Sequence, residues 1–249
     1  MLDLEVIGQG ATTKIYRDGS TAVKLYVNAP PDEAENEAIR QRMAYDAGLP
    51  VPAVFGVRQW EGSAVALDME YIDGRPLMYP EMGEEALGEA IQTLVRLHRM
   101  VHTVSAGGLP RLNDRLARRI RQTPHLEAAD KDRLLALSNR LSGGADKLCH
   151  GDFHPLNVLY DGGKHWIIDW VDAAAGDPLA DVCRTYLLLM QNLPRLAEMY
   201  LQAFCKETET EREDVLAWLP VVAAGRLGEK LDNKARAWLL ELIKGTGAV

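Results

Sequence analysis

The chain has 249 residues, of which 47% are hydrophobic and 26% are charged, a balance typical of a folded globular protein and not of a disordered one. Its 36 acidic and 28 basic side chains give a formal net charge of −8, which argues against nucleic acid or an anionic membrane as the main partner. The three cysteines are widely spaced and indicate neither a disulfide framework nor a zinc knuckle, so we expect a cytoplasmic protein.

The first quarter of the chain predicts a small β-sheet with one inserted helix. Strand-like runs occur at residues 4–7, 14–16, 21–26, 51–57 and 64–71. The dipeptide Asp18-Gly19 is typical of a hairpin turn between the second and third runs. A helix is expected from Glu33 to Ala47, where Gly48 ends it, so the helix follows the third strand.

After Asp73-Gly74 the pattern changes to that of helices, and this shift divides the chain into residues 1–73 and 74–249. Helices are expected at residues 84–104, 111–122 and 130–141, and again from 178 to 243. A short β-like segment at residues 158–168 interrupts them. The five arginines between Arg111 and Arg121 are interpreted as the solvated side of one helix.

The most informative motif is the run of residues 150–157, HGDFHPLN, which Asp169 follows twelve positions after Asn157. Asn157 enters a short hairpin, and the turn at residues 161–163 is expected to bring Asp169 back beside it. Carboxylate and amide oxygens are the ligands that hard cations such as Mg²⁺ prefer. The pattern therefore predicts a magnesium site at Asn157 and Asp169, with Asp152 beside it, free to accept a proton.

This loop resembles the H-x-D-x-x-x-x-N loop of the aminoglycoside phosphotransferase and choline kinase-like families, which are relatives of protein kinases. His150, Asp152, Asn157 and Asp169 match by order and spacing. The resemblance implies an α+β, two-lobed protein kinase-like fold, with a small β-rich N-terminal lobe containing one helix and a larger, mostly helical C-terminal lobe. It also implies transfer of a phosphoryl group from ATP, with GTP as an alternative, to a hydroxyl of a small molecule, with Mg²⁺ as cofactor and Asp152 as the catalytic base.

The same resemblance extends to nucleotide-binding parts in the first lobe. Gly8 and Gly10 lie at a strand-to-strand turn whose backbone N–H groups can cover phosphates. A tight turn alone also explains such a pair, and Thr13 stands where protein kinases have a third glycine. The segment containing Glu70 and Ile72 resembles the hinge whose backbone hydrogen-bonds adenine.

A lysine and a helical glutamate complete the nucleotide-binding set. Lys24, on the third strand, can reach the α- and β-phosphates, and a glutamate on the next helix can hold it in place. Glu37 is the expected partner, but Glu33 lies one turn away on nearly the same helix face, so both remain candidates. Gly151 replaces the arginine of the protein-kinase H-R-D motif, which favours a small-molecule kinase over a phosphorylation-gated one.

Supporting roles are expected for other polar residues of the second lobe. His98 and His102 lie on a helix stripe that faces the core, and a packed, hydrogen-bonded role is favoured over metal binding. Asp177, directly before Pro178, has the form of a helix N-cap. Asp181 is expected to hydrogen-bond the backbone of the catalytic loop, as its counterpart in the family does.

Two other functions compete with a small-molecule kinase. A metal-dependent hydrolase would use His150, Asp152 and His154 as ligands, but it leaves Lys24 and Asn157 without a role. A nucleotide-binding module without turnover would not need the catalytic residues of the motif, which are all present in this chain. The identity of the acceptor stays open among aminoglycosides, choline-like alcohols, homoserine and sugars, and so does the oligomeric state.

Overall fold

The computed structural model of the chain describes residues 5–9, 13–27, 29–30, 32–60, 62 and 64–245. It contains two compact units, each formed by two stretches of the chain. Residues 1–82 and 155–173 make up the first unit, and residues 83–154 and 174–249 make up the second. The division into lobes at residue 73 stays a prediction, and the two units are described separately below.

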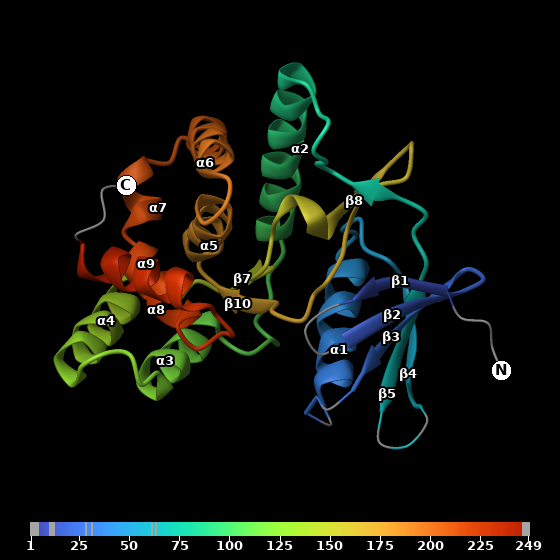
Figure 1. Cartoon of the computed structure of the whole chain (residues 1–249), viewed down its shortest axis with the longest axis horizontal. Helices are drawn as coiled ribbons and strands as arrows, with labels where there is room; N and C mark the ends of the chain where they lie inside the picture. Colours follow the sequence, from blue (N-terminus) through green and yellow to red (C-terminus); the bar gives the residue numbers. More distant parts are fainter. Residues whose placement is uncertain are drawn as a thin grey trace. The chain divides into compact units, whose positions relative to one another are not determined.

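The first unit is built on a five-stranded antiparallel sheet with the strand order β1-β2-β3-β5-β4 (Figure 1). Its strands are β1 (Glu5–Gln9), β2 (Thr13–Asp18), β3 (Thr21–Tyr26), β4 (Val54–Gln59) and β5 (Val65–Glu70). The predicted helix is present as α1 (Glu33–Asp46) and packs against β4 and β5. Ala38 of α1 and Leu67 of β5 are fully buried in the core between the helix and the sheet. The expected sheet with one helix after its third strand is confirmed.

Strand β4 begins three residues later than the sequence pattern predicts. The pattern favoured a strand from Val51, whereas the ladder with β5 begins at Val54. Pro52 has no N–H to donate to a neighbouring strand, and its ring restricts the residue before it. The apolar run therefore starts as irregular backbone, although Val51 itself is buried.

The stretch of the first unit from Pro155 onward forms a short helical turn and a hairpin. The turn η1 (Pro155–Asn157) leads into β8 (Val158–Tyr160), which pairs with β9 (His165–Ile167) and with β6 (Arg75–Pro76). The side chain of Asp161 closes the hairpin by accepting hydrogen bonds from the backbone N–H groups of Gly163 at 2.9 Å and Lys164 at 2.7 Å. This turn was predicted from the sequence, and it returns the chain to Asp169.

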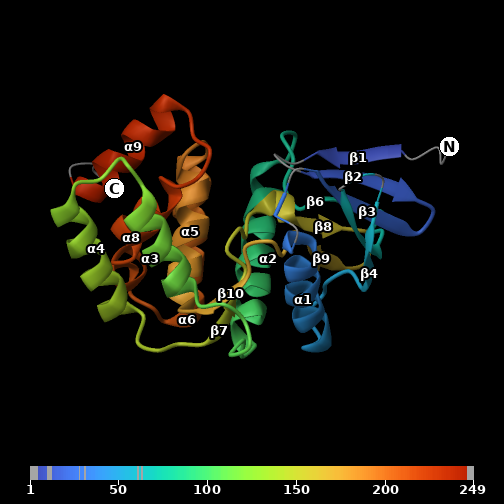
Figure 2. The same cartoon turned by 90° about the horizontal axis from the view of Figure 1, so that it is seen from below.

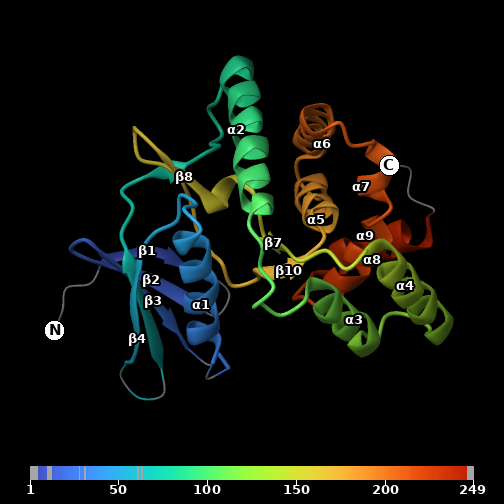
Figure 3. The ribbon, with the colours of Figure 1, turned by 180° about the vertical axis from the view of Figure 1, so that it is seen from behind.

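The second unit is mainly helical. Its elements are α2 (Glu84–Thr103), α3 (Leu112–Gln122), α4 (Ala128–Leu141), β7 (Lys147–Cys149), β10 (Ala174–Gly176), α5 (Pro178–Met190), α6 (Pro194–Thr208), α7 (Arg212–Leu216), α8 (Leu219–Arg226) and α9 (Asn233–Lys244). Strands β7 and β10 pair with each other in antiparallel fashion. Helix α2 packs against α6, and α8 is in contact with α3, α4, α5 and α9 (Figures 2 and 3). Among the described helices, none is both long and apolar enough to cross a membrane.

Two helices of this unit begin with an aspartate that caps the first turn. Asp177 accepts a hydrogen bond at 2.8 Å from the N–H of Leu179 at the start of α5, with Pro178 in the first helical position, as predicted. Asp232 accepts one at 2.7 Å from the N–H of Ala235 at the start of α9. Each cap satisfies a backbone donor that has no partner within its helix.

The cap of α9 can be tested without touching the candidate site. Replacing Asp232 by alanine removes the acceptor for the Ala235 N–H, so the free energy of unfolding should fall by about 1 kcal/mol. Asp232→Asn keeps a capping oxygen and should stay within about 0.5 kcal/mol of the wild type. Urea denaturation measures both values. Equal stability of the alanine and asparagine variants would show that the cap does not stabilise α9.

Candidate active site

In the first unit, a buried lysine lies between two carboxylates. Lys24 is on β3, and its Nζ atom lies 2.9 Å from Oε1 of Glu37 on α1 and 2.8 Å from Oδ1 of Asp169. The side chains of Lys24 and Glu37 are 5% and 1% exposed, whereas that of Asp169 is 42% exposed. The ion pair on α1 therefore forms with Glu37, which answers the choice that the helix pattern left open between Glu37 and Glu33.

Burial disfavours the charged forms of Lys24 and Glu37, whereas the opposite charges within the triad favour them. Burial lowers the pKa of Lys24, but the carboxylates of Glu37 and Asp169 outweigh it, so the pKa is raised and the ammonium group stays charged. Burial raises the pKa of Glu37 even with Lys24 beside it. With all three groups ionised, two negative charges surround one positive charge. In that state the triad carries a net negative charge. Asp169 is the most exposed of its three residues.

Asn157 is held next to Asp169 by the hairpin that connects them. The N–H of Ile168 donates to the carbonyl oxygen of Asn157 at 3.0 Å, directly beyond the last pair of the β8–β9 ladder. Asn157 is buried at the end of η1. Asp169 has a φ of +66°, a conformation that aspartate tolerates better than most residues. The hairpin thus brings the backbone of Asn157 to the residue directly before Asp169, and these two residues carry an amide oxygen and a carboxylate, the donors that Mg²⁺ prefers.

The remaining nucleotide-binding candidates that the structure describes, Gly8, Glu70 and Ile72, lie in or next to strands of the same sheet. Gly8 is in β1, at an irregularity of the β1–β2 ladder, and Gly10 lies outside the described residues. Glu70 ends β5, where its N–H donates to the carbonyl of Ala53 at 2.8 Å. Ile72 follows in irregular backbone. Their part in nucleotide binding stays a prediction.

In the second unit, a buried carboxylate holds the loop that carries Asp152. The N–H of His150 donates to Oδ2 of Asp181 at 2.7 Å, and the N–H of Gly151 donates to Oδ1 at 2.8 Å. Gly151 has a φ of +81°, in the left-handed region that favours glycine. The expected hydrogen bonds from the catalytic loop to Asp181 are therefore present, and the glycine fits the conformation that the loop adopts there.

Two further residues of α5, which no sequence motif marks, hold the same loop. The hydroxyl of Thr185 donates to the carbonyl of Phe153 at 2.7 Å. Nε of Arg184 donates to the carbonyl of Gly151. With Asp181, these residues follow the spacing of one helix face, i, i+3 and i+4, a periodicity that could have identified them once Asp181 was selected.

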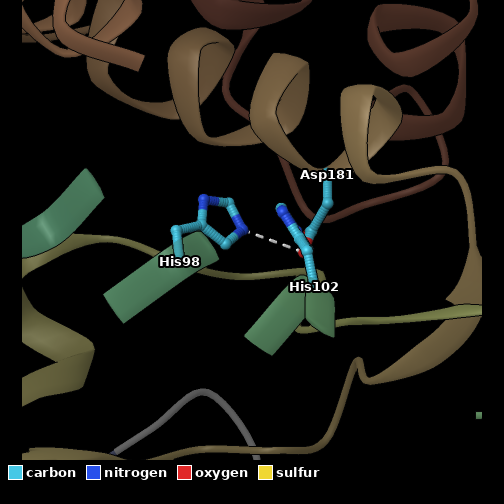
Figure 4. A group of neighbouring side chains, drawn as sticks. All are labelled: His98, His102 and Asp181. Carbon is cyan, nitrogen blue, oxygen red and sulfur yellow. Dashed lines mark hydrogen bonds and ion pairs between the residues drawn. The ribbon is translucent and has the colours of Figure 1, made fainter. Parts of the chain in front are cut away.

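Two histidines of α2 complete the surroundings of Asp181 (Figure 4). Nε2 of His98 lies 3.0 Å and Nε2 of His102 lies 3.1 Å from Oδ2 of Asp181. A carboxylate only accepts hydrogen bonds, so each Nε2 carries the proton, and Nδ1 of neutral His98 accepts from the hydroxyl of Tyr200 at 2.6 Å. Burial lowers the pKa of His98 to about 4, which keeps the ring neutral at physiological pH.

The same three side chains lie close enough together to hold a metal ion, since their ligand atoms are all within 4.8 Å of one another. Asp181, however, already accepts hydrogen bonds from two backbone amides and two imidazoles. Burial raises its pKa, but the two histidines more than offset this and hold the pKa well below the usual range. His98, His102 and Asp181 therefore form a hydrogen-bonded support for the loop, as expected for the two histidines.

Asp152 lies in a positively charged environment within the second unit. Its Oδ2 is 3.4 Å from Nε2 of His154, and its Oδ1 is 3.7 Å from Nη2 of Arg184. Burial raises the pKa of Asp152, but the hydrogen bond from His154 and the charge of Arg184 outweigh it and bring the pKa down to about 2. Asp152 is therefore a carboxylate at neutral pH, and its side chain is 30% exposed.

The model of the phosphotransferase enzyme family, APH, matches residues 3–218 of the chain. The chain belongs to this family. A crystal structure of the aminoglycoside phosphotransferase APH(4)-Ia matches this phosphotransferase-family chain with a TM-score of 0.74, at 17% identity, over 99% of this chain and 94% of that one. No curated protein sequence matches the chain.

Choline kinases are among the other structural neighbours of this phosphotransferase. A choline/ethanolamine kinase family protein from Mesorhizobium loti has a TM-score of 0.65 and 20% identity, with 98% of this chain and 86% of that one covered. The choline kinase LicA from Streptococcus pneumoniae has a TM-score of 0.68 and 16% identity, with 98% and 93% covered. The predicted family and the α+β, two-lobed protein kinase-like fold are thus confirmed.

Because His98 is buried and neutral, we expect the free energy of unfolding to fall as the pH falls. Its pKa is about 4 in the folded phosphotransferase and about 6.5 in an unfolded chain, so the unfolded chain binds a proton first as the pH falls. Between pH 7 and pH 5 the wild type should therefore lose about 2 kcal/mol more of its free energy of unfolding than His98→Gln. Urea denaturation at the two pH values measures this difference. Exposed His125→Gln is the control and should behave like the wild type, whereas equal losses in wild type and His98→Gln would contradict the account.

Proposed function

We propose that this chain is a kinase that transfers the γ-phosphoryl group of ATP to a hydroxyl group of a small molecule. The observation that carries the proposal is the buried Lys24, held between Glu37 and Asp169 in a chain of the phosphotransferase family. A lysine paired with a helical glutamate is the arrangement that kinases use to position the phosphates of a nucleotide. The related fold of APH(4)-Ia has been crystallised with ADP and with AMP-PNP, which supports a nucleotide as the donor.

On the nucleotide side, Lys24 binds the α- and β-phosphates. Its raised pKa keeps it cationic, and Glu37 holds its position because their side chains are buried together. Gly8 and Gly10 present backbone N–H groups to the phosphates, and the backbone at Glu70 and Ile72 hydrogen-bonds the adenine. These assignments follow the family pattern of the sequence.

Asn157 and Asp169 hold the magnesium ion. Their oxygens are hard donors, and the net negative charge of the lysine triad favours a cation at its exposed member, Asp169. When bound, Mg²⁺ neutralises the charge of the phosphate groups. The residues of the first unit therefore fit the ion that the family implies.

Asp152 positions the acceptor hydroxyl and receives its proton. The alcohol oxygen forms a bond to the γ-phosphorus, the bond from that phosphorus to the oxygen of ADP breaks, and the proton moves to a carboxylate oxygen of Asp152. With a pKa of about 2, Asp152 is ionised at neutral pH, and it accepts the proton only as the new bond makes the hydroxyl strongly acidic. Catalysis then rests on orientation and on charge neutralisation.

The hydrolase alternative has no support from the geometry. Nδ1 of His150 lies 3.3 Å from the N–H of Asp152 and accepts from it, so this ring braces the loop. Among the described residues, the group with metal-ligand spacing is His98, His102 and Asp181, not His150, Asp152 and His154. We therefore do not propose hydrolysis.

An ADP-release screen over a broad panel of small alcohols tests the proposal. With the best acceptor, Asp152→Asn should lower kcat by about a hundredfold or more, because it removes the base but leaves the nucleotide site intact. The Kd for ATP, measured by calorimetry, should stay within about twofold. Undiminished turnover in Asp152→Asn would overturn the assignment of the base.

Lys24→Met serves as the matched variant on the nucleotide side. It removes the cation that binds phosphates, so it should weaken ATP binding, whereas Asp152→Asn should not. Tight ATP binding by the wild type with no acceptor-dependent ADP formation would favour a non-catalytic nucleotide-binding module and contradict the proposal.

A further inference from the structure

The guanidinium group of Arg184 connects the catalytic loop to a glutamate that is distant in sequence but lies in the same unit. Arg184 is on α5, and its Nε donates to the carbonyl of Gly151. Its Nη1 donates to Oε1 of Glu229 at 2.8 Å, and its Nη2 lies 3.7 Å from Oδ1 of Asp152. The side chain of Arg184 is only 11% exposed, so these contacts are largely shielded from water.

Two of these contacts determine the third. A guanidinium group is planar and rigid, so holding Nε at Gly151 and Nη1 at Glu229 also fixes Nη2 beside Asp152. The separation of 3.7 Å exceeds the length of a hydrogen bond, so Arg184 acts on Asp152 mainly through its charge. Nε2 of His154 lies 3.4 Å from the other carboxylate oxygen, Oδ2. The two oxygens of Asp152 therefore have different neighbours, which favours one orientation of the carboxylate.

Glu229 has contacts of its own that hold it in place without Arg184. It lies in the loop between α8 and α9, where its N–H donates to the carbonyl of Arg226 at 2.9 Å. Its Oε1 also accepts from Nη1 of Arg119 on α3 at 3.1 Å, and its Oε2 accepts from Nε of Arg226 at 3.2 Å. The side chain of Glu229 is 23% exposed. Contacts from α3 and α8 thus fix the carboxylate to which Arg184 is bound.

A second glutamate of this unit forms similar bonds at a different place. Glu198, on α6, accepts from Arg212 at 2.8 Å and 3.0 Å, and from the hydroxyl of Tyr186 on α5 at 2.7 Å. Within the described part of the chain, neither Arg212 nor the side chain of Tyr186 forms a hydrogen bond or ion pair with residues 150–157. Removing Glu198 takes away a carboxylate of the same kind without affecting the contacts of the catalytic loop, which makes it a matched control.

We propose that Glu229 is a positioning residue for phosphoryl transfer: it fixes Arg184 in the place from which the guanidinium group orients the carboxylate of Asp152. The inference rests on the proposed function, in which Asp152 receives the proton of the acceptor hydroxyl. Orientation of such a group matters because a misplacement of about 1 Å can lower the rate by about a hundredfold. The loop between α8 and α9 thereby contributes to the reaction through Arg184.

The kinetics of Glu229→Ala test this role with the best acceptor found in the ADP-release screen. The variant removes the acceptor of Arg184 Nη1, so kcat should fall about tenfold, a part of the roughly hundredfold that a misplaced base can cost. The Kd for ATP should stay within about twofold, because the nucleotide site is unchanged. Glu229→Gln keeps one acceptor oxygen and should retain more of kcat than Glu229→Ala. Glu198→Ala should keep kcat within about twofold of the wild type.

A double-mutant cycle separates positioning of Asp152 from a general structural role. If Glu229 acts through Asp152, then Glu229→Ala should change kcat by less than about twofold once Asp152→Asn has removed the base. Arg184→Gln provides a second variant at the same connection, and it should give the same pattern: a loss of about tenfold or more in kcat alone, and little further loss in the Asp152→Asn background. Thermal melting establishes which variants are folded, and Arg184→Gln decides the question if Glu229→Ala does not fold.

Each outcome supports or overturns the role of Glu229. Unchanged kcat in Glu229→Ala would overturn the inference and leave the kinase function standing. An equal loss of kcat in both backgrounds would make Glu229 a structural residue and would also overturn it. A rise in the Kd for ATP without a fall in kcat would assign the effect to nucleotide binding instead. Absence of acceptor-dependent ADP formation by the wild type would overturn the proposed function and, with it, this inference.

Discussion

The second unit depends on one buried carboxylate, that of Asp181. It accepts hydrogen bonds from the backbone N–H groups of His150 and Gly151 and from the rings of His98 and His102. Four donors around one ion compensate for the cost of burying its charge, and they join β7, the catalytic loop, α2 and α5 at a single point. Without that charge, two backbone amides and two imidazoles would be buried without an acceptor, and the loop that carries Asp152 would lose its main support.

Charge imbalance distinguishes the functional residues from the structural ones. Asp181 is surrounded by donors and needs no ligand, which marks it as structural. In the first unit, Glu37 and Asp169 outnumber Lys24, so the site favours a cation. This imbalance is costly in the protein alone and is relieved by a bound cation, which is the physical basis of the proposed magnesium site.

Features carried by short segments could be predicted from the sequence, and those carried by distant residues could not. The turn of Asp161 and the N-cap of Asp177 were visible because their partners lie within a few residues. Lys24 was found through its family pattern, but the helix face alone did not separate Glu37 from Glu33; burial in the folded unit does. Glu229 accepts hydrogen bonds from Arg119, 110 residues away, and from Arg184, 45 residues away, and no local periodicity connects positions so far apart.

The most direct test of phosphoryl transfer to an alcohol is ³¹P NMR of the wild-type protein with ATP, Mg²⁺ and a mixture of small alcohols, amino alcohols and sugars. If the protein transfers the phosphoryl group to an alcohol, a new phosphate ester resonance should grow in step with the β-phosphate of ADP, with one ester for each ATP consumed and little inorganic phosphate. Formation of inorganic phosphate without an ester, or no consumption of ATP, would contradict transfer to an alcohol.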